Sequence, residues 1–307
     1  MKIFHTFILI NKPDFAKDKS IAMIYDLDGG VIIWKQRIWH GDYFIRAAAL
    51  GNTCYTMSCP RERMKPGMEL VKTKGIVLRS VNLGDYDKML TVLTEELGKI
   101  SVVAKGAKSL KHGGNSYANV FCYSDFVLYP KKELYTVSQA NGQESFFGLS
   151  EELERLECAA QMAEFVDYIC PADQPAPELL RLTLNSLFAL AQLHKPPLQV
   201  QVVFYLKALS LLGYEPELFY CSACDKEDGL THFSAEYGGV LCSDCAAHVP
   251  DRKPISADAL ALLRYIRSCG LKELFKFSAG ETVLRQVLGI LQDFLEQHLE
   301  YQLKKGL

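Results

Sequence analysis

The sequence lacks a long apolar run, an excess of charge of one sign and any low-complexity tract. A membrane-spanning helix needs about 18 or more uninterrupted apolar residues, and the apolar runs here are far shorter. The 307 residues include 34 Lys and Arg, 36 Asp and Glu, and 49% hydrophobic residues, a balance typical of globular chains. Membrane, collagen-like and coiled-coil classes are therefore excluded, and the length predicts about two domains.

The sequence also lacks common catalytic motifs and a secretion signal. It contains no P-loop and no Gly-x-Gly-x-x-Gly, His-Glu-x-x-His or Gly-x-Ser-x-Gly pattern, which predicts a protein that is not an enzyme. The start, Met1–Ile10, is a short apolar segment that no small-residue cleavage site follows. We therefore expect a cytoplasmic chain whose ten cysteines are reduced.

Charge is divided unevenly along the chain. Residues 1–67 carry a net +4, residues 68–148 a net +2 and residues 149–307 a net −8, which together give the total of −2. Residues 1–67 also lack sustained periodicity. We expect them to be an upstream extension, with Met68 as the natural start; an irregular N-terminal arm is the alternative.

Residues 68–148 are predicted to form a small β-barrel, because five short segments rich in Val, Ile, Thr, Tyr and Phe are separated by turn residues. Asp85 and Asp87 are interpreted as turn formers and not as paired catalytic carboxylates. A closed or partly open five-stranded barrel fits this length, and an SH3-like barrel is the alternative. The expected strands are Glu69–Arg79, Asp87–Thr94, Lys99–Lys105, Val120–Tyr129 and Glu133–Ala140.

Residues 149–307 are predicted to be all-helical with one interruption, so that the whole chain is an α+β multidomain protein. Apolar residues recur every three or four positions. Pro177 suits a first helical turn, Gly213 a helix end and Ser256 an N-cap. The expected helices are Glu151–Ile169, Pro177–His194, Leu198–Leu212, Ala257–Cys269 and Glu281–Leu303. The cysteines expected in the core are Cys122, Cys158, Cys170 and Cys269.

The interruption, at about residues 219–248, carries two Cys-x-x-Cys pairs that 17 residues separate. This spacing is typical of a four-cysteine zinc ribbon, because each short turn delivers two thiolates to a tetrahedral ion. One structural zinc is predicted, with no position open for catalysis. A redox pair is the alternative, and His232 or His248 could replace a ligand. The predicted ligands are Cys221, Cys224, Cys242 and Cys245.

Residues 99–132 hold six lysines and one acidic residue, Asp125. Spaced lysines and glycines on a barrel loop suit contacts with nucleic-acid phosphates. A flexible loop with solvated lysines is the alternative. Four aromatic residues in the same region could stack on bases or could simply pack the barrel: Tyr117, Phe121, Tyr123 and Tyr129.

Four consecutive motifs resemble the start of the bacterial RecO family of recombination mediators. They are Lys74–Arg79, Gly84–Lys88, Leu93–Lys99 and Ala104–Lys108, and Gly213–Pro216 is similar to the segment that leads into the family's zinc module. The resemblance covers residues 68–307 and implies an OB-fold, then a helical domain with an inserted four-cysteine module. Residues 1–67 have no counterpart in it.

The resemblance implies binding of single- and double-stranded DNA and annealing of complementary strands. It also implies that the protein works with RecR and RecF to load RecA onto strands coated by single-strand-binding protein. The protein would contact the acidic C-terminal tail of that coating protein. Fewer arginines than is usual in the family weaken the expected phosphate contacts, since lysine lacks bidentate geometry. The expected DNA contacts are Lys74, Arg79, Lys99, Lys105, Lys108 and Lys111.

Two other functions remain open on the sequence. The first is a zinc-ribbon adaptor without intrinsic DNA affinity, whose acidic helical domain would bind a protein partner. The second is a metal-dependent enzyme, against which the closed four-cysteine site argues.

Overall fold

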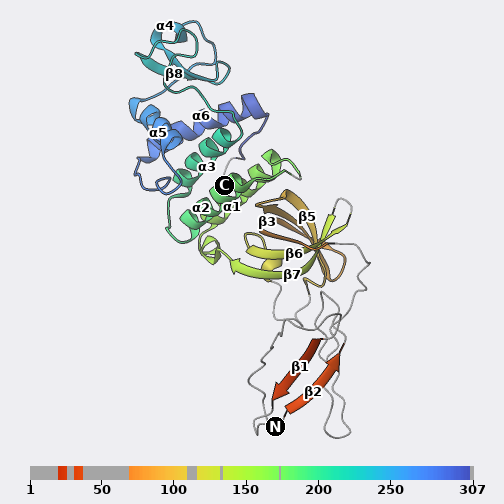
Figure 1. The fold of residues 1–307 in the computed structure, drawn as a ribbon. Helices are drawn as coiled ribbons and strands as arrows, with labels where there is room; N and C mark the ends of the chain where they lie inside the picture. Colours follow the sequence, from red (N-terminus) through yellow and green to blue (C-terminus); the bar gives the residue numbers. More distant parts are fainter. Residues whose placement is uncertain are drawn as a thin grey trace. The chain divides into compact units, whose positions relative to one another are not determined.

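The computed structural model describes residues 20–25, 31–36, 69–108, 116–131, 134–172 and 174–304 (Figure 1). The chain divides into two compact units, Met1–Met64 and Lys65–Leu307. In the first unit, β1 (Ser20–Tyr25) and β2 (Val31–Gln36) form an antiparallel hairpin. The rest of the predicted extension lies outside the described residues, as does Lys111.

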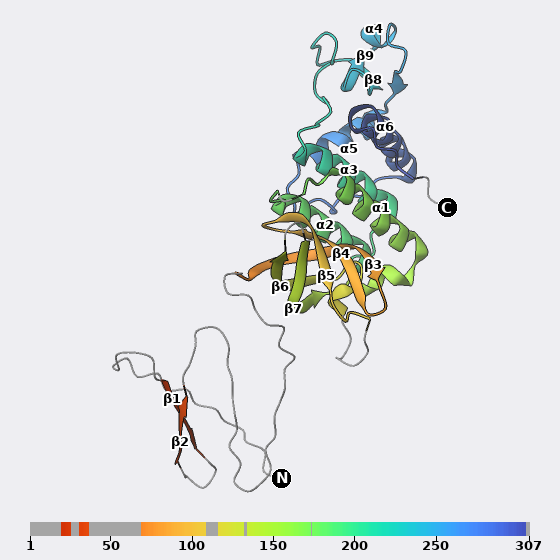
Figure 2. The ribbon, with the colours of Figure 1, turned by 90° about the vertical axis from the view of Figure 1, so that its right-hand side faces the viewer.

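The second unit begins with a closed five-stranded barrel (Figures 1 and 2). The strands follow the order β3-β4-β5-β7-β6, with β5 and β7 parallel and the other pairs antiparallel. This closed order of five strands confirms the predicted barrel as an OB-fold and rules out the SH3-like alternative. The strands are β3 (Val71–Leu83), β4 (Asp87–Thr94), β5 (Gly98–Ala104), β6 (Tyr123–Lys131) and β7 (Leu134–Glu144).

The barrel closes because β3 is long and irregular enough to pair on both sides. Its ladder with β4 shifts register between Val77 and Arg79, which marks a bulge that bends the strand. Gly75 also leaves no room for a Cβ, which would lie 2.7 Å from Val92 Cγ1. The predicted start of β6 at Val120 is wrong. Phe121 instead has a left-handed φ of 64°, and its N–H donates to the Val77 carbonyl.

Five long helices follow the barrel, as predicted, with changes at their ends. Ser256 caps α5, accepting the Ala259 N–H at 3.2 Å, and Pro177 begins α2. The final helix ends at Leu299 and not at Leu303, because Glu300 takes a left-handed conformation with φ 53°. The helices are α1 (Leu153–Ile169), α2 (Pro177–Ala191), α3 (Pro197–Leu211), α5 (Ala257–Ser268) and α6 (Glu281–Leu299).

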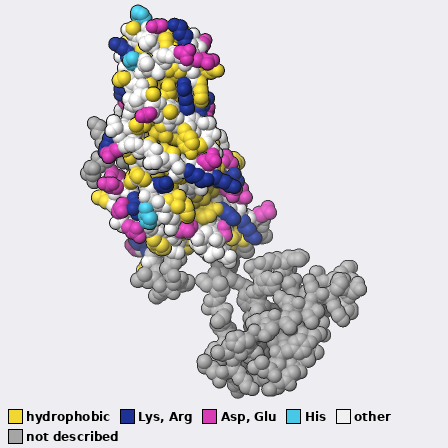
Figure 3. Space-filling model, turned by 90° about the vertical axis from the view of Figure 1, so that its left-hand side faces the viewer, with side chains coloured by type: hydrophobic (Ala, Val, Ile, Leu, Met, Phe, Trp, Pro, Cys, Tyr) yellow, Lys and Arg dark blue, Asp and Glu magenta, His cyan; other side chains and the backbone are white. Residues whose placement is uncertain are grey.

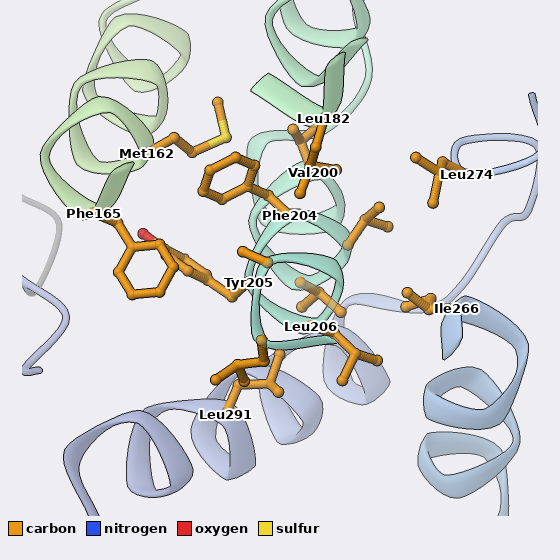
Figure 4. Packing of buried hydrophobic residues seen from close by; sticks show 14 of the residues in the cluster. Met162, Phe165, Leu182, Val200, Phe204, Tyr205, Leu206, Ile266, Leu274 and Leu291 are labelled. Carbon is orange, nitrogen blue, oxygen red and sulfur yellow. The ribbon is translucent and has the colours of Figure 1, made fainter. Parts of the chain in front are cut away.

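Helix α3 lies at the centre of the helical core, since its described contacts include α1, α2, α5 and α6 (Figure 4). Phe204 and Tyr205 project from it towards Phe165 of α1, and the rings of Phe165 and Tyr205 meet edge to face at 5.1 Å. The four cysteines predicted for the core are buried, and burial raises the pKa of the Cys158 thiol. None of the helices among the described residues combines the length and the hydropathy that a membrane span requires.

The barrel packs directly on the helices through the β4–β5 turn. Gly98 has a φ of +65°, and a Cβ there would collide with the Gln174 carbonyl. Next to it, Lys99 Nζ lies 3.1 Å from the Asp167 carboxylate and also donates to the Asp167 carbonyl. This contact fixes one end of the barrel against α1.

Candidate metal centre and nucleic-acid interface

The inserted module is a small ribbon. Its sheet has the order β10-β8-β9, and the short helix α4 (Ser243–Ala246) follows β9 directly. The first cysteine pair lies in the segment before β8, and the second spans the end of β9 and the first residues of α4. The chain thus brings two turns that are distant in sequence to one place. The strands are β8 (Leu230–Ser234), β9 (Gly239–Cys242) and β10 (Lys253–Pro254).

All four predicted ligands converge in this ribbon. The Sγ atoms of Cys221, Cys224, Cys242 and Cys245 lie within 4.8 Å of one another, and the Cys224–Cys242 separation is 3.8 Å. A tetrahedral zinc ion with Zn–S bonds of about 2.3 Å sets its sulfur atoms roughly 3.8 Å apart. The cluster therefore has the size of a four-thiolate metal site.

The environment of the cluster favours a thiolate at Cys221 and opposes ionisation of Cys224 and Cys245. Burial opposes ionisation of Cys221, but N–H groups of the knuckle backbones outweigh it and lower the pKa of that thiol to about 6. The Cys242 N–H donates to Cys221 Sγ at 3.3 Å. The Cys245 thiol makes hydrogen bonds to the sulfur atoms of Cys224 and Cys242, which raise its pKa to about 12, so a bound cation would favour ionisation of all four sulfur atoms.

Neither histidine considered as an alternative ligand belongs to the cluster. Among the described residues, the metal-capable group consists of the four cysteines. The His232 ring nitrogen Nδ1 lies 2.9 Å from the Thr231 hydroxyl oxygen. Four thiols already provide a complete tetrahedral shell, as expected of a structural centre.

Close backbone packing supports the first knuckle. The Glu217 N–H donates to the Gly238 carbonyl, and the Val240 N–H donates back to the Glu217 carbonyl, both at 2.9 Å. Gly239 lies between them, where a Cβ would meet the Glu217 carbonyl and the Ser222 hydroxyl. The glycine pair at 238–239 therefore lets two segments approach closely.

Gly239→Ala should destabilise the ribbon by about 1–3 kcal/mol, the usual cost of forcing extra volume into a packed site. Thermal unfolding of the metal-loaded protein measures the effect. Gly270→Ala is the matched control, because a Cβ there meets no atom within 4 Å. Equal stability of both variants would show that the Glu217 segment shifts freely.

The predicted DNA contacts do not all lie together. Lys105 and Lys108 are exposed in the turn that follows β5, and this turn contacts the β3–β4 turn. Lys74 and Arg79 are exposed on β3. Lys99 lies at the contact with α1, where its side chain is only 22% exposed.

Asp87 is the first residue of β4, and the turn that its carboxylate stabilises is the one after β5, which could not be read from the sequence. Its carboxylate accepts the Gly106 N–H at 2.8 Å, while the Tyr86 carbonyl accepts the Lys108 N–H at 3.0 Å. Lys88, a cation that the sequence reasoning missed, donates from the same hairpin to the Ala118 carbonyl at 3.4 Å. Only its place in the Gly84–Lys88 motif could have indicated it.

Three of the four aromatic residues considered as stacking platforms pack the protein instead. Phe121 is buried, and Tyr123 packs against the helical core. The Tyr117 ring meets Phe126 edge to face at 6.3 Å, and burial raises the pKa of its hydroxyl. Of the two interpretations, packing therefore holds for these three, Tyr117 in the barrel and Phe121 and Tyr123 against the helical core.

Lys99→Ala is expected to cost about 1–2 kcal/mol of stability, because it removes a partly buried charged hydrogen bond between barrel and α1. It should leave DNA affinity nearly unchanged. Urea unfolding and a DNA titration at several salt concentrations measure both effects. The variant Lys105→Ala provides the comparison. If Lys99→Ala reduced the slope of log affinity against log salt by as much as Lys105→Ala does, Lys99 would be a DNA contact.

Comparison with known families agrees with this architecture. Residues 68–146 match the family model described as Recombination protein O N terminal, and residues 150–306 match Recombination protein O C terminal. The chain belongs to the RecO family. Membership confirms the predicted class, a DNA repair and recombination protein and not an enzyme.

Several curated relatives, each called DNA repair protein RecO, are similar over most of their length. That of Acetivibrio thermocellus is 37% identical over 238 residues, covering 76% of this chain and 93% of the relative. That of Desulfitobacterium hafniense is 32% identical, covering 77% and 88%. The Bacillus pumilus RecO is 31% identical, covering 76% and 91%.

Proposed function

We propose that this RecO-family protein binds single- and double-stranded DNA and anneals complementary strands. With RecR and RecF, it would help to load RecA onto strands coated by single-strand-binding protein. The observation that carries the proposal is the pair of docked turns at one end of the barrel. There, Lys105 and Lys108 are exposed beside the Gly84–Lys88 hairpin of a RecO-family OB-fold.

Electrostatics supports a one-sided contact with DNA. The barrel region, residues 68–148, has a net charge of +2, whereas residues 149–307 have −8. Acidic and basic side chains are interspersed on the face shown in Figure 3, without a broad field of positive charge. DNA would therefore meet the barrel, and the acidic helical domain would provide folding and partner contacts.

We also propose one structural zinc ion held by the four cysteine thiolates. The 3.8 Å separation of two sulfur atoms and the N–H donors around Cys221 support it. The ion would neutralise the clustered thiolates and join the two knuckles. No step of strand binding or annealing needs the ion to touch DNA.

Strand annealing by the full chain tests the function most directly. The protein should accelerate pairing of complementary oligonucleotides, both free and coated with single-strand-binding protein. A chain that bound RecR or the coating protein but no DNA at low salt would contradict the proposal. That result would support the alternative of a zinc-ribbon adaptor, which the −8 charge of the helical domain favours.

A further inference from the structure

Tyr86 is the one strongly exposed aromatic residue in the described part of the barrel, with 69% of its surface accessible. It ends the three-residue turn Gly84–Tyr86, which joins the paired residues Leu83 and Asp87 of β3 and β4. Tyr117, Phe121 and Tyr123, which follow β5, are packed, as described above. An exposed aromatic ring is therefore available at this turn and not at those three positions.

The turn that carries Tyr86 is held firmly beside the lysine-bearing turn. Lys108 contacts it twice: its N–H donates to the Tyr86 carbonyl at 3.0 Å, and its Nζ lies 3.3 Å from the Gly84 carbonyl oxygen. The Asp87 carboxylate accepts the Gly106 N–H from the other side. Tyr86 and Lys108 thus lie in two turns that are hydrogen-bonded to each other. Because these turns are already ordered, binding a ligand there costs little conformational entropy.

The surroundings of Tyr86 are apolar as well as basic. Val81 and Leu83 are exposed on β3, and two-residue spacing places them on the same outward face as Arg79. Asp85, exposed in the same turn, disfavours close approach of a phosphate at the tip. An uncharged base could contact the tip beside Asp85, while the lysines bind phosphates further along the strand. This arrangement suits both the apolar and the basic surroundings of Tyr86.

We propose that Tyr86 stacks on an unpaired base of single-stranded DNA while Lys105 and Lys108 contact the neighbouring phosphates. The inference rests on the proposed DNA binding by the barrel and adds a preference for single strands. Bases in a duplex already stack on one another, so this ring gains a partner only where a base is free.

A comparison of a base-containing strand with an abasic strand of the same length isolates the stacking contact. Tyr86→Ala should weaken binding of an oligothymidine by roughly 5- to 100-fold, the range that base–aromatic stacking contributes. Affinity for the abasic strand and for duplex DNA should not change. Tyr86→Phe keeps the ring and should bind all three like the unaltered protein.

Phe147→Ala is the matched control, because it removes an exposed ring (80% accessible) that lies outside the barrel. It should leave all affinities unchanged. If Tyr86→Ala weakened both strands equally, or neither, base stacking by Tyr86 would be refuted, while strand binding by the unaltered protein would still support the broader function. If the unaltered protein bound no strand at low salt, the proposed DNA binding and the stacking would both be overturned.

Discussion

Cys221→Ser and Cys242→Ser are each expected to abolish stoichiometric metal binding and to unfold the ribbon. The module has only a small core of its own, because its buried cluster has five members, two of which are these cysteines. A core of that size cannot offset the conformational entropy of the segment. Zinc binding by comparable small sites contributes about 10–16 kcal/mol at neutral pH, far more than such a cluster.

The damage should extend into the helical domain. Phe233 and Val240 of the ribbon belong to the main hydrophobic core, and the His298 ring of α6 lies 2.8 Å from the Ala235 carbonyl oxygen. Metal analysis should give one zinc per unaltered chain and none for either variant, with a lower unfolding temperature. Cys269→Ser, at a buried cysteine outside the cluster, should keep the metal. A zinc-free unaltered protein that a chelator does not destabilise would contradict the metal site.

Local patterns made the metal site and most elements predictable. Two Cys-x-x-Cys turns already indicate which four side chains converge. Each turn positions two cysteines, and a tetrahedral ion needs both pairs. In the barrel strands apolar residues tend to alternate with polar ones, and in the helices apolar residues recur every three or four positions, so the sequence indicates which residues are buried. Local patterns therefore predicted a zinc ribbon and a small five-stranded barrel, but they left the OB-fold and the SH3-like barrel open, and the strand order decides between them.

What could not be predicted depends on contacts between distant segments. Lys99 belongs to a basic stretch in sequence, yet it forms an ion pair with Asp167 of α1 where the barrel contacts the helices. The turn that carries Tyr86 docks on the segment after β5 through the hydrogen bond from the Lys108 N–H to the Tyr86 carbonyl, which joins residues 22 positions apart in sequence. Helix α6 ends where Glu300 turns left-handed, and no glycine marks that position.

Reversing both charges in the docked turn, Lys105→Glu with Lys108→Glu, is expected to remove most DNA binding at physiological salt. Each phosphate contact contributes about 0.7 to the slope of log affinity against log salt for single strands and about 0.9 for duplexes. Loss of two contacts should flatten the slope by roughly 1.4 and 1.8 respectively, and the introduced carboxylates add repulsion. Fluorescence anisotropy across a salt series measures both slopes, and annealing should be lost in parallel.

The matched control reverses two exposed lysines of the helical domain, Lys272→Glu with Lys276→Glu, which changes the net charge by the same amount. If DNA binding followed net charge alone, both double variants would lose affinity equally. If it depends on the docked turns, only the barrel variant should lose affinity and slope. Because residues 149–307 already carry −8, DNA has little reason to approach Lys272 and Lys276, and we expect the control to bind like the unaltered chain. Intact binding and annealing after reversal at Lys105 and Lys108 would move the DNA contact away from this end of the barrel.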